Sequence, residues 1–282
     1  MRVNNRGLAV IKVENKLSSS FLLQPTVQSV SPQSGSVKGG SILTIKGDGF
    51  SLDNSLTFVH IVGAACKINS ISYNQIRCKT SEKSASQALE VEVKVNGVKA
   101  HCSSIFSCSF TYSTSKTPKV DSVEPSAIVG TDNVIRIYGS GFPSKMSDLD
   151  VQIGNISCTV MSSSQYSASC RLGPIVAGKH TLRIHVAGQG LAMFEADASS
   201  TINSRAAVSS LTPVEGSIMG GTELSIKGSG FDPTEGRTTV QIGAHYCTVT
   251  RVTSSEVGCI TSAHSPGSFE VQTDKCYTSQ IV

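Results

Sequence analysis

Apolar and polar residues alternate along most of this chain, and the alternation returns in three similar blocks. One pair of alternating apolar residues in each block shows the pattern: Leu43 with Ile45, Ile135 with Ile137, and Leu224 with Ile226. A period of two residues is typical of strands that bury one face. No stretch keeps an apolar face at i, i+3, i+4 and i+7 over three turns, so the pattern predicts an all-β protein.

A longer phrase repeats around these strands. Its copies run from Pro25 to Phe50, from Pro118 to Phe142 and from Ala206 to Phe231. They begin about every 90 residues, which indicates small domains and excludes a solenoid of short repeats. We therefore expect domains at residues 25–115, 116–204 and 205–282.

The two ends of the chain are expected to cut through further copies. Val3–Ala9 resembles Val186–Ala192 near the end of the second copy, so residues 1–24 are predicted to be the C-terminal remnant of a preceding domain. The third copy is expected to be truncated at its C-terminal end, because it lacks a counterpart of Phe110-Thr111-Tyr112. Met1 is then an internal or mispredicted start.

Each copy carries proline and glycine at fixed places. Pro32 and its counterparts lack the donor that a central strand needs, which predicts an edge strand ending at a bend. The phrase Gly-x-Gly-Phe then closes the next strand, as at Gly47–Phe50. No helix and no Lys-Ser/Thr pair follows it, so it predicts a turn with a core phenylalanine and not a phosphate loop.

Composition and charge narrow the function. The chain has 16% charged residues and a net charge of +4 without a basic block, which argues against a nucleic-acid binder. The first residues make a poor signal peptide, because Lys12 and Glu14 interrupt the apolar stretch. No run of about 18 apolar residues exists that could span a membrane.

The chain has nine cysteines, and most of them recur at equivalent positions of the three copies. Three pairs are each twelve positions apart, and one further pair flanks a predicted hairpin tip: Cys66 with Cys78, Cys158 with Cys170, Cys247 with Cys259, and Cys102 with Cys108. Pairing at fixed spacing predicts a disulfide framework, typical of secreted proteins. Cys276 is left unpaired; its partner is expected in missing residues, with a reactive thiol for an intermolecular link as the alternative.

Chemistry beyond the cysteines is sparse. The six histidines are scattered and no motif of a known catalytic, cofactor or metal site occurs, so we expect no enzyme activity, no cofactor and no metal. Asn155-Ile156-Ser157 is a glycosylation sequon in a predicted turn, and turns are exposed. Asn155 is therefore a predicted glycosylation site.

The order of these features resembles the IPT/TIG domain, an immunoglobulin-like module. The shared pattern is P-x-V-x-S-V-x-P, then G-G-(S/T)-x-L-x-I-x-G-x-G-F, then V-x-I-G and two cysteines; the middle copy departs from it at Thr131-Asp132-Asn133. The resemblance implies tandem β-sandwiches of the immunoglobulin-like, E-set type. Direct tandem copies with short linkers look most like the fibrocystin family, with its fibrocystin-L branch favoured.

That resemblance implies a non-catalytic extracellular array from a large, single-pass cell-surface receptor. Such an array binds partner proteins or neighbouring modules of the same parent chain, or acts as a spacer, without nucleic acid. The location implied is the extracellular side of the plasma membrane or the secreted pool, with signal peptide and anchor outside this chain. One alternative is the stalk of a plexin-like or Met-like receptor whose catalytic or signalling parts lie elsewhere. The other alternative is a nuclear DNA-binding dimerisation module. The reducing nucleus would not favour the paired cysteines of this chain.

Overall fold

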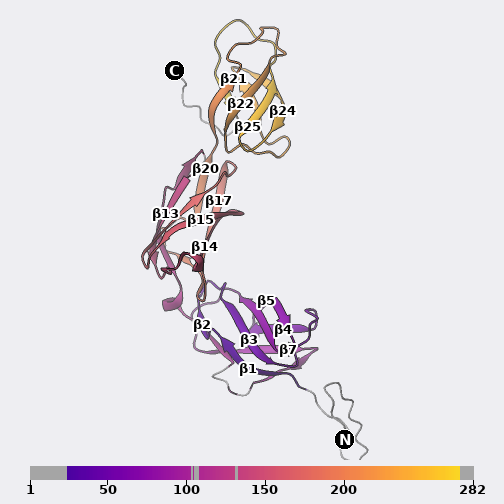
Figure 1. Cartoon of the computed structure of the whole chain (residues 1–282), viewed down its shortest axis with the longest axis vertical. Coiled ribbons are helices and arrows are strands. Elements are labelled where there is room, and N and C mark those ends of the chain that lie inside the picture. Colours follow the sequence, from indigo (N-terminus) through magenta and orange to yellow (C-terminus); the bar gives the residue numbers. More distant parts are fainter. Residues whose placement is uncertain (1–23, 103, 105–107, 131–132, 274–282) are drawn as a thin grey trace, which may run out of the picture.

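The protein forms three β-sandwiches that follow one another in an elongated row (Figure 1). The structure is a computed structural model and describes residues 24–102, 104, 108–130 and 133–273. We call the sandwiches modules 1, 2 and 3; they begin near Pro25, Pro118 and Ala206. Strands dominate, which confirms the predicted all-β, immunoglobulin-like fold. The predicted remnant at residues 1–24 lies almost wholly outside the described residues, as does Cys276.

Module 1 is built from ten strands; nine of them form one curled, hydrogen-bonded path, and β8 lies off this path and pairs with β7. They are β1 (Thr26–Ser31), β2 (Ser34–Gly35), β3 (Ile42–Asp48), β4 (Thr57–Ile61), β5 (Ala64–Ser72), β6 (Gln75–Thr80), β7 (Leu89–Val95), β8 (Val98–Lys99), β9 (His101–Cys102) and β10 (Ser109–Tyr112). One layer contains β1, β3, β6 and β5; the other contains β4, β7 and β10, and β5 pairs with strands of both. The core lies between the layers.

Module 2 repeats this order after a short 3-10 turn, η1 (Thr114–Lys116). Its elements are β11 (Lys119–Glu124), β12 (Ala127–Val129), β13 (Asn133–Ser140), η2 (Met146–Asp148), β14 (Leu149–Ile153), β15 (Ile156–Ser163), β16 (Ser167–Leu172), β17 (Gly178–Val186), β18 (Gly190–Leu191), β19 (Met193–Phe194) and β20 (Thr201–Arg205). Each strand of module 1 has its counterpart ten numbers later, with the same neighbours.

Module 3 has the same sequence of pairings with fewer strands. They are β21 (Ala207–Thr212), β22 (Glu223–Ser229), β23 (Val240–Ile242), β24 (His245–Val252), β25 (Glu256–Ile260) and β26 (Val271–Thr273). The path runs β21-β22-β25-β24-β23-β26 and ends at β26, the counterpart of β7 and β17. Among the described residues, module 3 has no counterpart of β10 or β20.

The repeated phrase has the same structural role in each module. The phenylalanine of Gly-x-Gly-Phe is buried in all three copies: Phe50, Phe142 and Phe231. The glycine before it has a positive φ of 79° or 80° at Gly49, Gly141 and Gly230, a region that favours glycine. The predicted turn with a core phenylalanine is therefore confirmed.

The first strand differs from its prediction in modules 1 and 2, whereas β21 of module 3 lies at the edge of its path among the described residues. β1 pairs with β3 on one side and, over Thr26 and Val27, with β9 in parallel on the other. It is therefore not a simple edge strand, and the prediction was wrong there because the partner strand comes from much later in the chain. The bend after it does occur at the proline, and the Ser31–Pro32 bond is cis, as are its counterparts before Pro125 and Pro213.

Candidate functional site: the junctions between modules

The described residues do not gather into a site for metal chemistry. They contain no group of three or more His, Cys, Asp or Glu side chains able to hold a metal ion. His180 forms a hydrogen bond within its own module, with Nε2 2.7 Å from the carbonyl oxygen of Val176. His245 and His264 pack edge to face, with ring centroids 4.3 Å apart. None of these contacts brings together a nucleophile, a base and an orienting group.

The cysteines form bridges between neighbouring strands. In each module the twelve-residue pair joins two adjacent strands, with Cα separations of 5.4, 5.5 and 5.7 Å: Cys66 with Cys78, Cys158 with Cys170, and Cys247 with Cys259. These distances lie in the usual range for a disulfide. The partners are diagonal neighbours on the core face, as Cys66 lies opposite Thr80 and Cys78 opposite Ile68.

The fourth bridge is placed differently from the prediction. Cys102 belongs to β9, which pairs with β1, whereas Cys108 precedes β10, which pairs with β7 and β2. The two cysteines therefore do not flank the tip of a simple hairpin. Their bridge ties the strand beside β1 to the strand that closes the opposite layer.

Exposed charges in module 1 are arranged as local ion pairs. Lys94 lies 2.8 Å from Glu92, and its hydrogen bond holds the pKa of that carboxyl below its usual value. Lys99 reaches both Glu90 and Glu92, and these hydrogen bonds raise the pKa of its amine. All four groups line the β7–β8 hairpin. Pairs of this kind on a surface add little stability and report no catalytic site.

The most elaborate long-range contact lies between modules 1 and 2. The hairpin of module 2 formed by β17 and β18 reaches into the loop between β2 and β3 of module 1. We call this contact the hairpin clamp; it comprises Ser36–Ser41 of module 1, together with His185 and Gln189–Leu191 of module 2. The sequence separation of about 150 residues makes it a tertiary contact that no local pattern encodes.

Backbone atoms make the centre of the hairpin clamp. The Ser36 amide donates to the carbonyl of Gln189 at 2.8 Å, and the Leu191 amide donates to the carbonyl of Gly39 at 2.8 Å. Such bonds hold the two segments in a fixed register, as the hydrogen bonds between two short strands of a sheet would. The two modules are therefore held through atoms whose positions are set by rigid turns.

Side chains complete the hairpin clamp. The hydroxyl of Ser41 donates to the Gln189 carbonyl at 2.5 Å, and the hydroxyl of Ser36 donates to the Leu191 carbonyl at 2.5 Å. The imidazole Nε2 of His185 donates to the Gly40 carbonyl at 2.9 Å. Ser36 and Ser41 are fully buried, so their hydroxyls would lose much by going unpaired.

Glycines permit the close approach at the hairpin clamp. A Cβ on Gly40 would lie 2.7 Å from Cγ of Leu191, and one on Gly35 would lie 2.8 Å from the Gln189 carbonyl oxygen. A Cβ on Gly190 would meet the Gly39 carbonyl even more closely. Real Cβ atoms do not approach so near, so any side chain here would move the modules apart.

The linker between modules 1 and 2 is also packed. Thr117 is buried, and its hydroxyl donates to the Ser113 carbonyl at 2.7 Å while accepting the Val37 amide at 2.9 Å. The Met193 amide donates to the carbonyl of Pro118. The linker is therefore fixed to module 1 at Thr117, and module 2 begins directly after it at Pro118 with the same backbone bond that His101 makes to Pro25 in module 1.

The junction between modules 2 and 3 has a simpler construction. β20 ends at Arg205 and β21 begins at Ala207, so a single buried alanine separates the two modules. Ala177 of module 2 packs against the core of module 3, and its amide donates to the carbonyl of Gly230 at 2.8 Å. The modules are joined by near-continuity of one strand and one loop contact.

The comparison with known families now decides what these modules are. A family model for the IPT/TIG domain matches residues 25–112, 118–202 and 206–277, most of the chain. The chain belongs to the IPT/TIG domain family. This confirms the family that the repeated phrase suggested, and the three matched segments coincide with the three sandwiches of Figure 1.

Relatives of this IPT/TIG chain include fibrocystin-L and fibrocystin. Human fibrocystin-L is 34% identical over 272 residues, 96% of this chain and 6% of the human protein. Mouse fibrocystin-L is 35% identical over 265 residues, with 94% and 6% covered. Mouse fibrocystin is 29% identical over 171 residues, with 61% and 4% covered. The predicted similarity to fibrocystin-L is confirmed, and the chain spans about 6% of the length of those relatives.

Among solved structures, the extracellular region of plexin A4 is similar over 96% of this chain and 24% of the plexin chain, at 17% identity and a TM-score of 0.40. Within the described part of this IPT/TIG chain, no helix is long and apolar enough to cross a membrane.

Sequence reasoning missed the hairpin clamp. It noticed the stretch Val186–Ala192 only because Val3–Ala9 resembles it. The available signal was that His185 and Leu191 occupy the places of Lys94 and Lys99 in module 1, next to a turn that contains Gly188 and Gly190. The acceptors of its hydrogen bonds are backbone carbonyls, which carry no residue-type signature.

Proposed function

We propose that this chain is a non-catalytic, extracellular segment of a fibrocystin-like cell-surface receptor, in which IPT/TIG modules act as a spacer of fixed geometry. Its immediate partners are neighbouring modules of the same parent chain, and its outer faces are available to partner proteins. The hairpin clamp is the observation that carries this proposal. Domains joined by small polar interfaces are expected to move relative to one another. At the hairpin clamp the hydrogen bonds are buried and glycines allow the backbones to approach closely, which favours a fixed angle between modules 1 and 2.

The extracellular location rests on the cysteines. Four bridges with ordinary Cα separations, one or two in each module, would not persist in a reducing compartment. A DNA-binding role is not favoured, because the net charge of +4 is spread along the chain. The disulfides stabilise the modules, whose hydrophobic cores are small and contain no tryptophan.

Small-angle X-ray scattering on the 282-residue chain tests the spacer. We expect the wild-type profile to fit one rigid arrangement of modules 1 and 2. Gly190→Ala should broaden the distribution of interatomic distances, because the added Cβ collides with the backbone of Gly39. A wild-type profile that requires freely varying angles between modules 1 and 2 would refute the proposal.

Gly188→Ala is the matched control for that experiment. Gly188 lies in the same hairpin turn with a φ of 75°, but a Cβ there has no atom within 4 Å. It strains the turn without touching module 1. If Gly190→Ala disturbs module 2 itself, Ser41→Ala tests the same contact from module 1, since it removes one hydrogen bond to Gln189 and alters no residue of module 2.

A further inference from the structure

One outer face of module 1 carries four exposed cations. Lys46 lies on β3, Lys67 on β5, and Arg77 and Lys79 on β6. The residues next to them along each strand are mostly buried, so the four side chains leave the sheet on its outer side. We call this surface the basic face. Because its members come from three strands, no run of basic residues in the sequence indicates it.

Strand register puts the four cations in one diagonal row. Lys67 is paired directly with Lys79, and Arg77 lies two residues before Lys79 on β6, on the same side of the sheet. Lys46 is paired with Gln75, which makes it the diagonal neighbour of Arg77. With strands about 4.8 Å apart and a rise of about 3.4 Å per residue, the row spans roughly 15 to 20 Å.

The basic face is electrostatically unfavourable when nothing is bound to it. Lys67 and Lys79 lie directly opposite each other, and like charges in this position destabilise a sheet. The bridge between Cys66 and Cys78, one residue before each lysine, holds the two strands together. Within the described part of the chain, none of the four cations forms an ion pair. β3, β5 and β6 contain one acidic residue, Asp48, at the end of β3. A bound anion would relieve this repulsion.

The opposite outer face of module 1 has a different arrangement of charge. Its cations Lys94 and Lys99 lie beside Glu90 and Glu92 and form ion pairs with them. Cations and carboxylates are therefore matched on that face and unmatched on the basic face. The excess of positive charge belongs to one side of the module and is not a general property of its surface.

The counterpart positions of modules 2 and 3 show that the fold does not require these cations. At the same four places module 2 has one cation, Arg171, and module 3 has one, Lys227. Module 2 adds Arg136 at the place of Thr44, and Lys227 is paired directly with Glu256. The row of four cations is therefore a property of module 1 and not of the sandwich.

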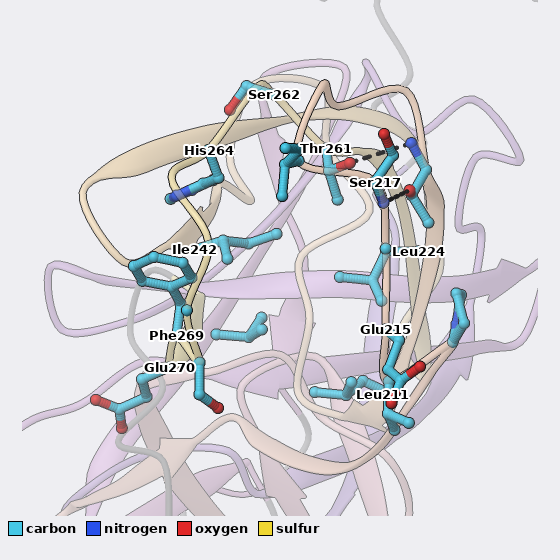
Figure 2. A pocket seen from close by; sticks show the side chains of 18 of the residues that line it. Leu211, Glu215, Ser217, Leu224, Ile242, Thr261, Ser262, His264, Phe269 and Glu270 are labelled. Atoms are coloured by element: carbon cyan, nitrogen blue, oxygen red, sulfur yellow. Dashed lines mark hydrogen bonds between the residues drawn. The ribbon is translucent and has the colours of Figure 1, made fainter.

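An anion finds no comparable site in the pocket of module 3 (Figure 2). Glu215 and Glu270 belong to the described residues that line this pocket, and no lysine or arginine does. The basic face is open and extended where that pocket is concave. An open row of cations suits a chain of anions, whereas single small ligands are usually bound in concave sites.

We propose that the basic face binds a linear sulfated polysaccharide of the extracellular space, an inference that rests on the location proposed above. The diagonal row can follow a polymer with repeated sulfates, and the planar guanidinium of Arg77 can donate two hydrogen bonds to one sulfate. Thr44, Ser70 and Gln75 lie in the same outward rows and offer hydroxyl and amide groups to the sugar.

Other polyanions fit the basic face less well. Anionic lipids are concentrated in the cytoplasmic leaflet of the plasma membrane, away from an extracellular chain. An acidic protein partner would usually be anchored by buried aromatic side chains, and β3, β5 and β6 contain no aromatic residue. A nucleic acid shares the repeated negative charge of a sulfated polysaccharide, so the experiment must compare the two directly.

A fluorescent heparin decasaccharide added to the full 282-residue chain tests the proposal by anisotropy. We expect saturable binding that weakens at least about five-fold when NaCl rises from about 50 to about 200 mM, because salt screens exposed charges. Desulfated heparin of the same length should bind at least about ten-fold more weakly. Double-stranded DNA with the same number of charges should bind more weakly than heparin.

Substitutions taken from another module remove charge without disturbing the sandwich. Lys67→Thr with Arg77→Ser introduces the residue types that module 2 has at the same places, and should weaken heparin binding about ten-fold or more. Lys94→Thr with Lys99→Ser is the matched control, because it removes two charges from the opposite face. Its binding should stay within about two-fold of the wild type.

Lys67→Glu separates binding from folding. The new carboxylate faces Lys79 across the two strands, so the midpoint of denaturation should stay the same or rise. Heparin binding should nevertheless weaken about ten-fold or more. A variant that lost binding through unfolding would instead have a lower midpoint.

Three results would overturn the proposal: no saturable binding of heparin, an equal loss of binding in the control with both Lys94 and Lys99 replaced, or undiminished binding of desulfated heparin. Tighter binding of DNA than of heparin would overturn it in favour of a nucleic acid. Non-reducing peptide mapping tests the extracellular location separately, so the two proposals can fail independently.

Discussion

The imidazole Nε2 of His185 lies 2.9 Å from the carbonyl oxygen of Gly40, across the boundary between modules 1 and 2. Among the described residues, His185 is the one histidine whose ring forms a hydrogen bond to another module; the ring of His180 bonds Val176 within module 2. The contact lies beside the bond from the Leu191 amide to the Gly39 carbonyl. The histidine therefore helps to hold the hairpin clamp closed.

Removing that imidazole should loosen the hairpin clamp. In His185→Ala one intermodule hydrogen bond is lost, which is worth about 1 kcal/mol. Exchange of the Leu191 amide should then be roughly five-fold faster by hydrogen-exchange mass spectrometry or NMR. His180→Ala is the control, because it removes a comparable bond inside module 2. Equal acceleration in both variants would show that the effect comes from module 2 alone.

The twelve-residue disulfides should each stabilise their module. Cys158 and Cys170 are both buried, so replacing the pair with Val keeps much of the packing while it opens the loop. We expect a loss of about 3 kcal/mol in the free energy of unfolding, measured with denaturant. Peptide mapping of secreted protein under non-reducing conditions gives the direct check. Free thiols at Cys66 and Cys78 in that material would contradict the extracellular proposal.

Asn155 should carry a glycan. Its side chain is exposed in the turn between β14 and β15, where an enzyme can reach it. Protein from a secretory host should lose the mass of one N-linked glycan on treatment with N-glycosidase. Ser157→Ala, which destroys the sequon, should remove that mass difference without changing the fold. An unshifted wild-type protein would mean that the turn is not modified.

Tyr112→Phe should leave module 1 as stable as before or more stable by about 1 kcal/mol. The phenol oxygen is buried, and no hydrogen bond to it occurs among the described residues. An unpaired buried hydroxyl is unfavourable, whereas the ring contact with Phe110 survives the change. Chemical unfolding at neutral pH measures the difference. A clear loss of stability would reveal a partner for the hydroxyl.

The same tyrosine should make module 1 sensitive to alkali. Burial raises the pKa of Tyr112 above its ordinary value of 10.0, because the phenolate would lose its hydration. Because the pKa of Tyr112 is higher in the folded than in the unfolded protein, the neutral phenol contributes its full stability at pH values below the unfolded-state pKa. That contribution is lost as the pH rises through the folded-state pKa. The free energy of unfolding, measured from pH 8 to about 11, should therefore fall more steeply with pH in the wild type than in Tyr112→Phe. Parallel slopes in the two proteins would contradict this.

The sequence alone determined the architecture of each module. Alternating pairs such as Leu43 with Ile45, together with the proline and glycine punctuation, are local signals that act within one strand or turn. They predicted the β-sandwich fold and the buried Phe50 correctly. The family followed from the order of those signals, repeated three times.

Only the tertiary structure decided how the modules meet. The hairpin clamp joins Ser36 to Gln189 through backbone groups that every residue possesses, so no side-chain pattern announces it. The position of β9 beside β1 likewise depends on a strand far along the chain. Local periodicity specifies which face of a strand is buried, whereas the partner that covers that face is set by three-dimensional packing.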